Sequence, residues 1–395
     1  MAPGFLGCSQ HAPKNPEAYR LGLPMTSSSF DYDTFVDDLG PQKIVHIHDP
    51  SAGLLAVLVI DNVARGPSVG GVRMAPDVTT EEVFRLARAM TFKNAGAGLP
   101  HGGGKAGIMA DPKTTDKEAL IRAFAHAIRD LVDYIPGPDM GTDEACMAWI
   151  RDEIGRAVGL PREVGGIPLD EIGATGFGLR ECADVAAEFC GLDLSTATLA
   201  IEGFGNVGRP AARFLAERGV TLVAASDSKG AVENPDGIDI DELVAAKEES
   251  GSVTGLRGAR QILGEELFHV PCDILIPAAR PDCINDNNVD GIQAKLILQG
   301  ANIPATTTAE TRLHERGVLV VPDFIANAGG VICASVEFNG GTEAGASAVI
   351  GEKIRQNTRE VLEAVAKGGI LPREAAVQLA RARVEKAMTF QRTFV

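Results

Sequence analysis

A glycine-rich turn, set between an apolar run and a helical pattern, is the feature that most constrains the fold of this chain. Residues 198–202 have the composition of a strand, Gly203-Phe204-Gly205-Asn206-Val207-Gly208 follow at once, and residues 210–218 have helical spacing. The glycines allow a tight turn and close packing of the helix on the strand. Asp227 ends the next apolar run. Together these features predict a Rossmann-type unit.

Such a turn can bind the phosphates of a dinucleotide, because backbone amides and the positive end of the helix dipole meet there. The expected cofactor contacts of this unit are Gly203, Gly205, Asn206, Val207, Gly208, Asp227 and Ser228. Asp227 favours NAD, since a carboxylate accepts hydrogen bonds from the ribose hydroxyls and repels the 2′-phosphate of NADP. Ser228 and Lys229 could bind that phosphate, so NADP is kept as an alternative. The remaining alternative is a turn without a ligand.

Apolar runs and helical segments alternate beyond this turn. The runs lie at residues 221–226, 274–276, 296–298 and 318–321. Strands that alternate with helices predict an α/β fold with a doubly wound, largely parallel sheet. The length of 395 residues allows two or three domains. We expect two α/β domains around a cleft, at residues 1–180 and 181–347, followed by C-terminal helices at 348–395 that return toward the first domain.

Composition excludes several classes of partner. The net charge of −16 and the lack of a basic patch argue against nucleic acid. No apolar run is long enough to span a membrane, and the loosely structured first thirty residues lack the pattern of a secretory signal, so we expect a cytoplasmic protein. The seven Cys and seven His are scattered without paired spacing, so no metal site is expected.

A second glycine-rich segment ends in a lysine, at Leu99-Pro100-His101-Gly102-Gly103-Gly104-Lys105. It is not a phosphate-binding P-loop, because its spacing differs and Ala106 stands where that motif has a hydroxyl. Three glycines let the backbone pack closely and place the Lys105 ammonium in a confined site. Lys93 is the natural second cation, and burial beside it would lower the pKa of Lys105. The alternative is a pair of surface lysines.

An acid follows a rigid segment at Pro136-Gly137-Pro138-Asp139. Prolines fix the backbone, which suits an acid that must be held in one position. Asp139 could equally cap the helix expected to run through Trp149. Local sequence does not decide between these roles.

Eight motifs follow one another in order over roughly residues 40–345. They are Gly70-Gly71-Val72-Arg73-Met74, Met90-Thr91-Phe92-Lys93-Asn94, the segment from Leu99 to Lys105, Pro138-Asp139-Met140-Gly141-Thr142, Ala174-Thr175-Gly176, the turn from Gly203 to Gly208, Gln299-Gly300-Ala301-Asn302, and Asn327-Ala328-Gly329-Gly330-Val331. In these motifs the chain resembles the glutamate/leucine/phenylalanine/valine dehydrogenase superfamily.

The resemblance implies reversible oxidative deamination of an L-amino acid to its 2-oxo acid and ammonia, with NAD or NADP as the cofactor. It implies that Lys105 polarises the carbonyl group and activates water, that Asp139 moves a proton to and from the amino group, and that Lys93 binds the α-carboxylate. It implies further contacts with the cofactor or the substrate at Thr175, Asn206 and Asn302. It also implies a homo-oligomer, whose contacts lie in the substrate-binding first domain.

The chain departs from the glutamate dehydrogenases of this superfamily at two positions. They carry a lysine where this chain has Val69 and a serine where it has Ala334, and both bind the side-chain carboxylate of glutamate. Burying that carboxylate without a partner is unfavourable. We therefore expect an apolar substrate, as in the leucine/valine/phenylalanine branch, and the small Gly137 indicates room for a bulky or aromatic side chain. The expected substrate-binding residues are Lys93, Gly70, Gly71, Val69, Gly137, Asn302, Val331 and Ala334.

Two other interpretations remain open. The segments 226–230 and 234–237 look more like glutamate dehydrogenases, so a glutamate dehydrogenase with another basic residue for the side chain is the first alternative. The second is a non-catalytic protein that binds cofactor or amino acid. Intact Lys93, Lys105 and Asp139 argue against the second, because binding alone does not require them.

Overall fold

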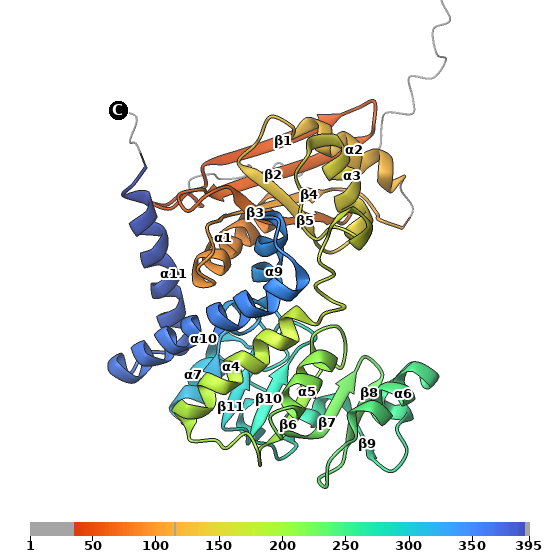
Figure 1. The fold of residues 1–395 in the computed structure, drawn as a ribbon, viewed down its shortest axis with the longest axis vertical. Helices are drawn as coiled ribbons and strands as arrows, with labels where there is room; N and C mark the ends of the chain where they lie inside the picture. Colours follow the sequence, from red (N-terminus) through yellow and green to blue (C-terminus); the bar gives the residue numbers. More distant parts are fainter. Residues whose placement is uncertain (1–34, 114–115, 392–395) are drawn as a thin grey trace, which may run out of the picture.

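The computed structural model describes residues 35–113 and 116–391, in two α/β domains with helices between them (Figure 1). The segment that we expected to form an unstructured lead-in lies outside the described residues. The first domain contains a five-stranded sheet in the order β1-β2-β4-β3-β5. Its strands are β1 (Lys43–Asp49), β2 (Leu54–Asn62), β3 (Ser68–Met74), β4 (Gly102–Ile108) and β5 (Tyr134–Pro138), and its helices are α1 (Thr80–Gly96), α2 (Lys117–Ala127) and α3 (Glu144–Ile154).

Strand β2 shows how this sheet is buried on both faces. Successive side chains of a strand point to opposite faces. Leu58 and Ile60 pack with the apolar side chains of α2 and α3, whereas Val57 and Val59 pack with those of α1. The apolar run in this part of the sequence is thus an interior strand of a sheet that has helices on either side.

The second domain contains a seven-stranded sheet in the order β12-β11-β10-β6-β7-β8-β9. The strands from β12 to β7 are parallel, and β8 and β9 continue the sheet in antiparallel fashion. The strands are β6 (Thr198–Glu202), β7 (Thr221–Asp227), β8 (Gly230–Glu233), β9 (Arg260–Ile262), β10 (Ile274–Pro277), β11 (Leu296–Leu298) and β12 (Leu319–Val321). This architecture confirms the predicted two-domain α/β fold with a Rossmann-type sheet.

The helices of the second half are α4 (Ala174–Cys190), α5 (Gly208–Ala216), α6 (Ile240–Ser250), α7 (Thr307–Glu315), α8 (Asp323–Ala326), α9 (Gly329–Phe338), α10 (Glu343–Gly368) and α11 (Pro372–Met388). Short 3₁₀ turns lie at η3 (Arg162–Val164), η4 (Val253–Gly255), η5 (Gly264–His269) and η6 (Val289–Gly291). The domain boundary that we placed at residue 180 falls inside α4, whose buried face packs on the second sheet. In Figure 1, α11 runs from the second domain to the side of the first, where it packs on α1.

Among the described residues, no helix is both long and apolar enough to cross a membrane. The same residues include no group of three or more His, Cys, Asp or Glu side chains that could hold a metal ion.

Candidate active site

Three parallel strands of the first sheet deliver Lys105, Asp139 and Arg73 to one place. Strand β3 lies between β4, which carries Lys105, and β5, which ends next to Asp139. A β-carbon added to Gly71 on β3 would lie 2.7 Å from Asp139 Cβ and 3.1 Å from Lys105 Nζ. One added to Gly70 would lie 1.6 Å from Gly104 O. Both positions therefore require glycine, because a larger side chain would not fit. The two glycines let the strands approach each other and leave room for the side chains of Lys105 and Asp139.

Lys105 and Asp139 form an ion pair, and their side chains are 9% and 18% exposed. Burial lowers the pKa of Lys105, although the charge of Asp139 opposes that effect. Burial would raise the pKa of Asp139, but Lys105 and Arg73 outweigh it and the pKa lies below its usual value. The pair thus joins an ammonium group that releases its proton more easily than usual to a carboxylate that stays ionised. This arrangement is suited to proton transfer.

Asp139 does not cap the following helix. Helix α3 begins at Glu144, and the side chain of Asp143 accepts a hydrogen bond from Cys146 N. Asp139 instead accepts from Met140 N at 2.8 Å, and Asp139 N donates to Thr142 Oγ1 at 3.0 Å. The sequence left open whether Asp139 caps the helix. The structure shows that the capping acid is Asp143, four residues further along, and that the carboxylate of Asp139 faces Lys105.

Lys93, in the last turn of α1, contacts the second domain. Its Nζ donates to Asn302 Oδ1 at 3.3 Å, and Asn327 Nδ2 donates to the same oxygen at 3.1 Å. Burial lowers the pKa of Lys93 to about 8; the negative charge of Asp323 opposes this effect and the positive charge of Lys105 adds to it. Lys93 and Asn302, which the sequence predicted separately, are therefore in contact.

An apolar cluster lies beside these charges. Val69, Ile135 and Val158 are buried together, with Ala334 of α9 packed against them. Gly137 adjoins the same cluster, since a β-carbon there would lie 3.2 Å from Val158 Cγ2. The predicted residue Val331, one turn earlier on α9, packs against the main core of the second domain instead. Val69 and Ala334, distant in sequence, thus belong to one apolar cluster.

Thr175, at the start of α4, lies against the first turn of α9. A β-carbon on Gly330 would lie 3.3 Å from Thr175 Oγ1, and one on Gly329 would lie 3.0 Å from Thr175 Cα. This close approach places Thr175 beside the segment that carries Asn327.

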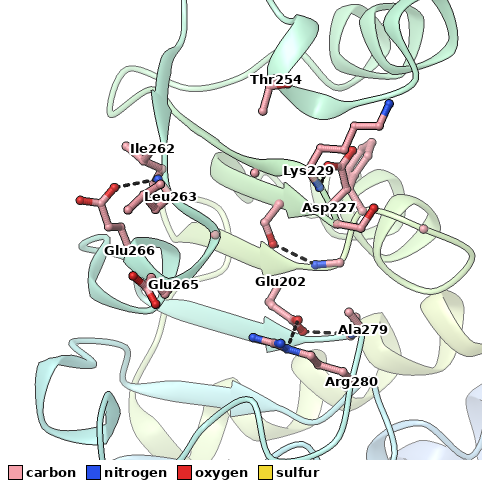
Figure 2. Close-up of a pocket in the computed structure, with 18 of the residues that line it drawn as sticks. Glu202, Asp227, Lys229, Thr254, Ile262, Leu263, Glu265, Glu266, Ala279 and Arg280 are labelled. Atoms are coloured by element: carbon pink, nitrogen blue, oxygen red, sulfur yellow. Dashed lines mark hydrogen bonds and ion pairs between the residues drawn. The ribbon is translucent and has the colours of Figure 1, made fainter.

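The glycine turn has the geometry of a phosphate-binding site. Gly203 has a φ of +93°, and a β-carbon on Gly208 would lie 2.2 Å from Gly203 O, so both positions require glycine. No heavy atom of the described residues lies within 4 Å of a β-carbon built on Gly205, which opens to the surface above the start of α5. The adjoining pocket has a volume of about 1110 Å³ and is drawn in Figure 2. These residues fit a dinucleotide.

Two predicted cofactor residues point to partners within the protein. Asn206 Nδ2 donates to Asp170 Oδ2 at 3.0 Å. The Asp227 carboxylate, 9% exposed, accepts from Lys229 N, Ser252 Oγ and Val253 N at 2.8–3.0 Å and lies 3.5 Å from Lys247 Nζ. Figure 2 shows Asp227 beside Lys229 at the edge of the pocket. We expected the carboxylate of Asp227 to be free for the ribose. It already has partners within the protein, because η4 packs against the end of β7.

Three further polar residues of the site had no role in the sequence analysis. Arg73 Nε lies 3.5 Å from Asp139 Oδ2, Asn327 holds Asn302, and Asp323 acts on Lys93 through its charge. Arg73 and Asn327 belong to motifs that carry the family resemblance, so position within a motif was an available signal. Asp323 had none, because its neighbours come from distant segments.

Comparisons with known proteins identify the family of this chain. Residues 165–392 match the family model described as Glutamate/Leucine/Phenylalanine/Valine dehydrogenase, and residues 41–156 match the Glu/Leu/Phe/Val dehydrogenase dimerisation domain. Glutamate dehydrogenase from Aeropyrum pernix is 42% identical over 354 residues, which cover 83% of this chain and 84% of that protein.

Two solved structures resemble this chain. Hetero-hexameric glutamate dehydrogenase from Thermus thermophilus, in its Leu-bound form, is 30% identical with a TM-score of 0.79 and covers 90% of this chain and 91% of its own. L-tryptophan dehydrogenase from Nostoc punctiforme is 26% identical with a TM-score of 0.72 and covers 89% and 97%. The chain therefore belongs to the glutamate/leucine/phenylalanine/valine dehydrogenase family and is an NAD(P)-dependent amino-acid dehydrogenase.

Proposed function

We propose that this dehydrogenase acts on an L-amino acid with an apolar side chain and converts it reversibly to the 2-oxo acid and ammonia. The observation that carries the proposal is the buried cluster of Val69, Ile135, Val158 and Ala334 beside the charged residues. A substrate carboxylate placed against these four side chains would lose its water without gaining a partner, which is unfavourable by several kcal/mol. An apolar side chain would gain free energy from the same burial.

In this proposal Lys93 binds the α-carboxylate as an ammonium ion. NAD(P), held at the turn from Gly203 to Gly208, would supply the acceptor for the α-carbon hydride, so that the substrate becomes an imine. Lys105 then directs water to the imine carbon. Asp139, which lies beside Lys105, takes the proton from the attacking water and returns it to the departing ammonia. Burial of the pair supports these roles, because both side chains are shielded from bulk water and held by neighbouring strands.

Glutamate is the second candidate substrate. The comparisons favour this candidate over an apolar substrate, because two of the three relatives described above, including the one of highest identity, are glutamate dehydrogenases. The branch of leucine, valine and phenylalanine dehydrogenases, which the pocket led us to expect, is named by none of the three. A basic residue also lies near the cluster: His101 is 3% exposed, and its Nε2 lies 3.0 Å from Oγ of Ser335, the neighbour of Ala334. This pair could receive a side-chain carboxylate in place of the missing lysine.

A panel of the twenty amino acids, assayed by absorbance of the reduced cofactor, separates the two candidates. We expect the highest kcat/KM with leucine, valine, phenylalanine or tryptophan, and a gain of glutamate activity in the double variant Val69→Lys, Ala334→Ser. Turnover with glutamate alone, lost in His101→Phe and retained in His101→Gln, would establish the second candidate. A double variant with the parent profile would show that the apolar cluster does not bind the substrate side chain.

The cofactor preference is a separate proposal. The sequence favoured NAD because Asp227 was expected to meet the ribose, but its carboxylate oxygens already have partners and Lys247 lies 3.5 Å away. Ser228, Lys229 and Lys247 line the same pocket. We propose that NADP is accepted as well as NAD. We expect Lys229→Ala to raise the KM for NADP several-fold and to leave that for NAD unchanged; equal KM values in parent and variant for both cofactors would refute a role for Lys229.

The first domain matches the family's dimerisation domain. We propose that the chain forms a homo-oligomer through this domain, which light scattering of the purified protein would measure. A cytoplasmic location stays a prediction of the sequence.

A further inference from the structure

The residue that follows Asn302 has a strained backbone. Ile303 has a φ of +49°. A β-branched residue rarely adopts this left-handed conformation, because its side chain crowds the backbone. The Ile303 side chain is 55% exposed, so its own packing contributes little to holding it there. Some other contact must stabilise the turn that presents Asn302 to the cleft.

A buried carboxylate supplies that contact. Ile303 N donates to Asp323 Oδ2 at 2.9 Å, and the other carboxylate oxygen lies 2.9 Å from Arg373 Nη1. The Asp323 side chain is 8% exposed. Arg373 is itself held by Glu310, at 2.7 Å, and by Gln299 Oε1, at 2.8 Å. The left-handed turn is therefore tied to a network of ionised side chains.

The turn places Asn302 against Lys93. Asn302 Oδ1 accepts from Lys93 Nζ at 3.3 Å, and this contact joins the two domains. The charged groups that act on Lys93 are Asp323, from the start of α8, and Lys105, from β4. Asp323 therefore acts on Lys93 twice: through the backbone of Ile303 it fixes the partner Asn302, and through its charge it favours the ammonium form.

Helix α11 links the same two segments from behind. Arg373, in its first turn, holds Asp323 in the second domain. Arg383, near its other end, donates to Ala95 O at 3.1 Å and Gly96 O at 2.9 Å, the last carbonyl groups of the helix that carries Lys93. One helix thus anchors both partners of the Lys93–Asn302 contact.

We propose that Asp323 is a positioning residue of the dehydrogenase reaction, which holds the Ile303 turn so that Asn302 and Lys93 form one binding site for the substrate α-carboxylate, and that Arg373 holds Asp323 in place. This proposal rests on the role of Lys93 proposed above. It predicts an effect on amino-acid binding that is larger than the effect on the cofactor or on turnover.

The test compares Asp323→Asn, Ile303→Gly and the double variant with the parent enzyme. We expect Asp323→Asn to raise the KM for the amino acid about tenfold, with kcat and the KM for the cofactor changed by less than about threefold. Gly adopts positive φ without strain. Ile303→Gly should therefore bring the amino-acid KM of the double variant part of the way back to the parent value, and by itself it should change that KM little. Asp290→Asn, the same change in an exposed acid paired with Arg312, is the matched control.

The pH profile provides a readout that a merely structural role would not change. Lys93 binds a carboxylate when it is protonated, so the KM should rise above about pH 8 in the parent. Loss of the Asp323 charge makes the ammonium less favourable. The rise should then begin about one pH unit lower in Asp323→Asn, and Asp290→Asn should keep the parent profile.

The proposal would be overturned if Asp323→Asn lowered kcat and raised both KM values to a similar extent. It would also be overturned if the amino-acid KM of the double variant were as high as that of Asp323→Asn. If Asp323→Asn does not fold, Arg373→Lys decides: it keeps the charge but loses the paired hydrogen bonds, and it should raise the KM for the amino acid alone. Lys93→Met separates the two levels of inference. An unchanged amino-acid KM in that variant refutes the proposed role of Lys93, whereas a raised KM together with a normal Asp323→Asn refutes the role of Asp323 alone.

Discussion

Gly71 lies in the first domain beside Lys105 and Asp139, whereas Gly205 lines a pocket of the second domain, and glycine is present at the two sites for different reasons. At Gly71 the space for a side chain is already filled by Asp139 and by Lys105, the two groups to which we assign the chemistry. At Gly205 the space is open, and a side chain there would meet no described atom. The first site is thus constrained by the protein itself, and the second is left free for a ligand. Substitutions at the two sites should therefore have different effects.

The largest effect is expected at Lys105, beside Gly71. Lys105→Met removes the buried ammonium beside Asp139 and should lower kcat about 10³-fold, the size usual for loss of a general acid–base group. Steady-state kinetics would measure it, with Lys43→Met, on the exposed face of β1, as the control. A loss of less than tenfold would mean that the chemistry lies elsewhere.

Gly71→Ala should damage both folding and turnover. The added methyl group would lie 2.9 Å from Pro138 O and 2.7 Å from Asp139 Cβ, so the backbone or the ion pair must move. We expect a loss of about 1–3 kcal/mol in the free energy of unfolding and a fall in kcat of about 10²-fold. Urea denaturation and kinetics would measure the two effects. A variant with parent stability would show that the strands can separate without strain.

Gly205→Ala should leave the stability of the fold unchanged and weaken the binding of the cofactor. Its methyl group meets no described atom, so the free energy of unfolding should stay within about 0.5 kcal/mol of the parent. The methyl group would nevertheless occupy the space that a pyrophosphate needs, and we expect the KM for the cofactor to rise about tenfold. Amino-acid KM measured at saturating cofactor is the internal control. If the two glycine variants lose stability equally, the contrast between the two sites is wrong.

Arg73→Gln should give the smallest change, a shift in pH dependence. The charge of Arg73 lowers the pKa of Asp139, the proposed proton acceptor, so its removal raises that pKa and leaves less of the ionised carboxylate at a given pH. The acidic limb of log kcat/KM should therefore move to higher pH, by about one unit. Arg122→Gln, in an exposed ion-pair network on α2, should leave the limb in place. A shift toward lower pH would contradict the electrostatic role of Arg73.

The sequence predicted the surroundings of some site residues and not of others. Lys105 could be placed in a confined site because three preceding glycines let neighbouring strands pack closely around its ammonium. The role of Asp139 could not be decided locally, since a nearby acid, Asp143, proved to be the helix cap. The role expected for Asp227 weakened because Ser252 and Val253, which engage its carboxylate, come from a loop that the motif does not include.

The sequence by itself determined the two-domain α/β fold, the dinucleotide turn and the family, because short-range patterns of apolar residues, glycines and charges specify strands, helices and tight turns. Tertiary structure alone decided which residues meet. Val69 joins Ala334 in one cluster, Lys93 meets Asn302 across 209 positions of sequence, and Asp323 holds the strained Ile303. Such contacts depend on how helices and sheets pack, and the direction of a carboxylate is set by neighbours that are distant in the chain.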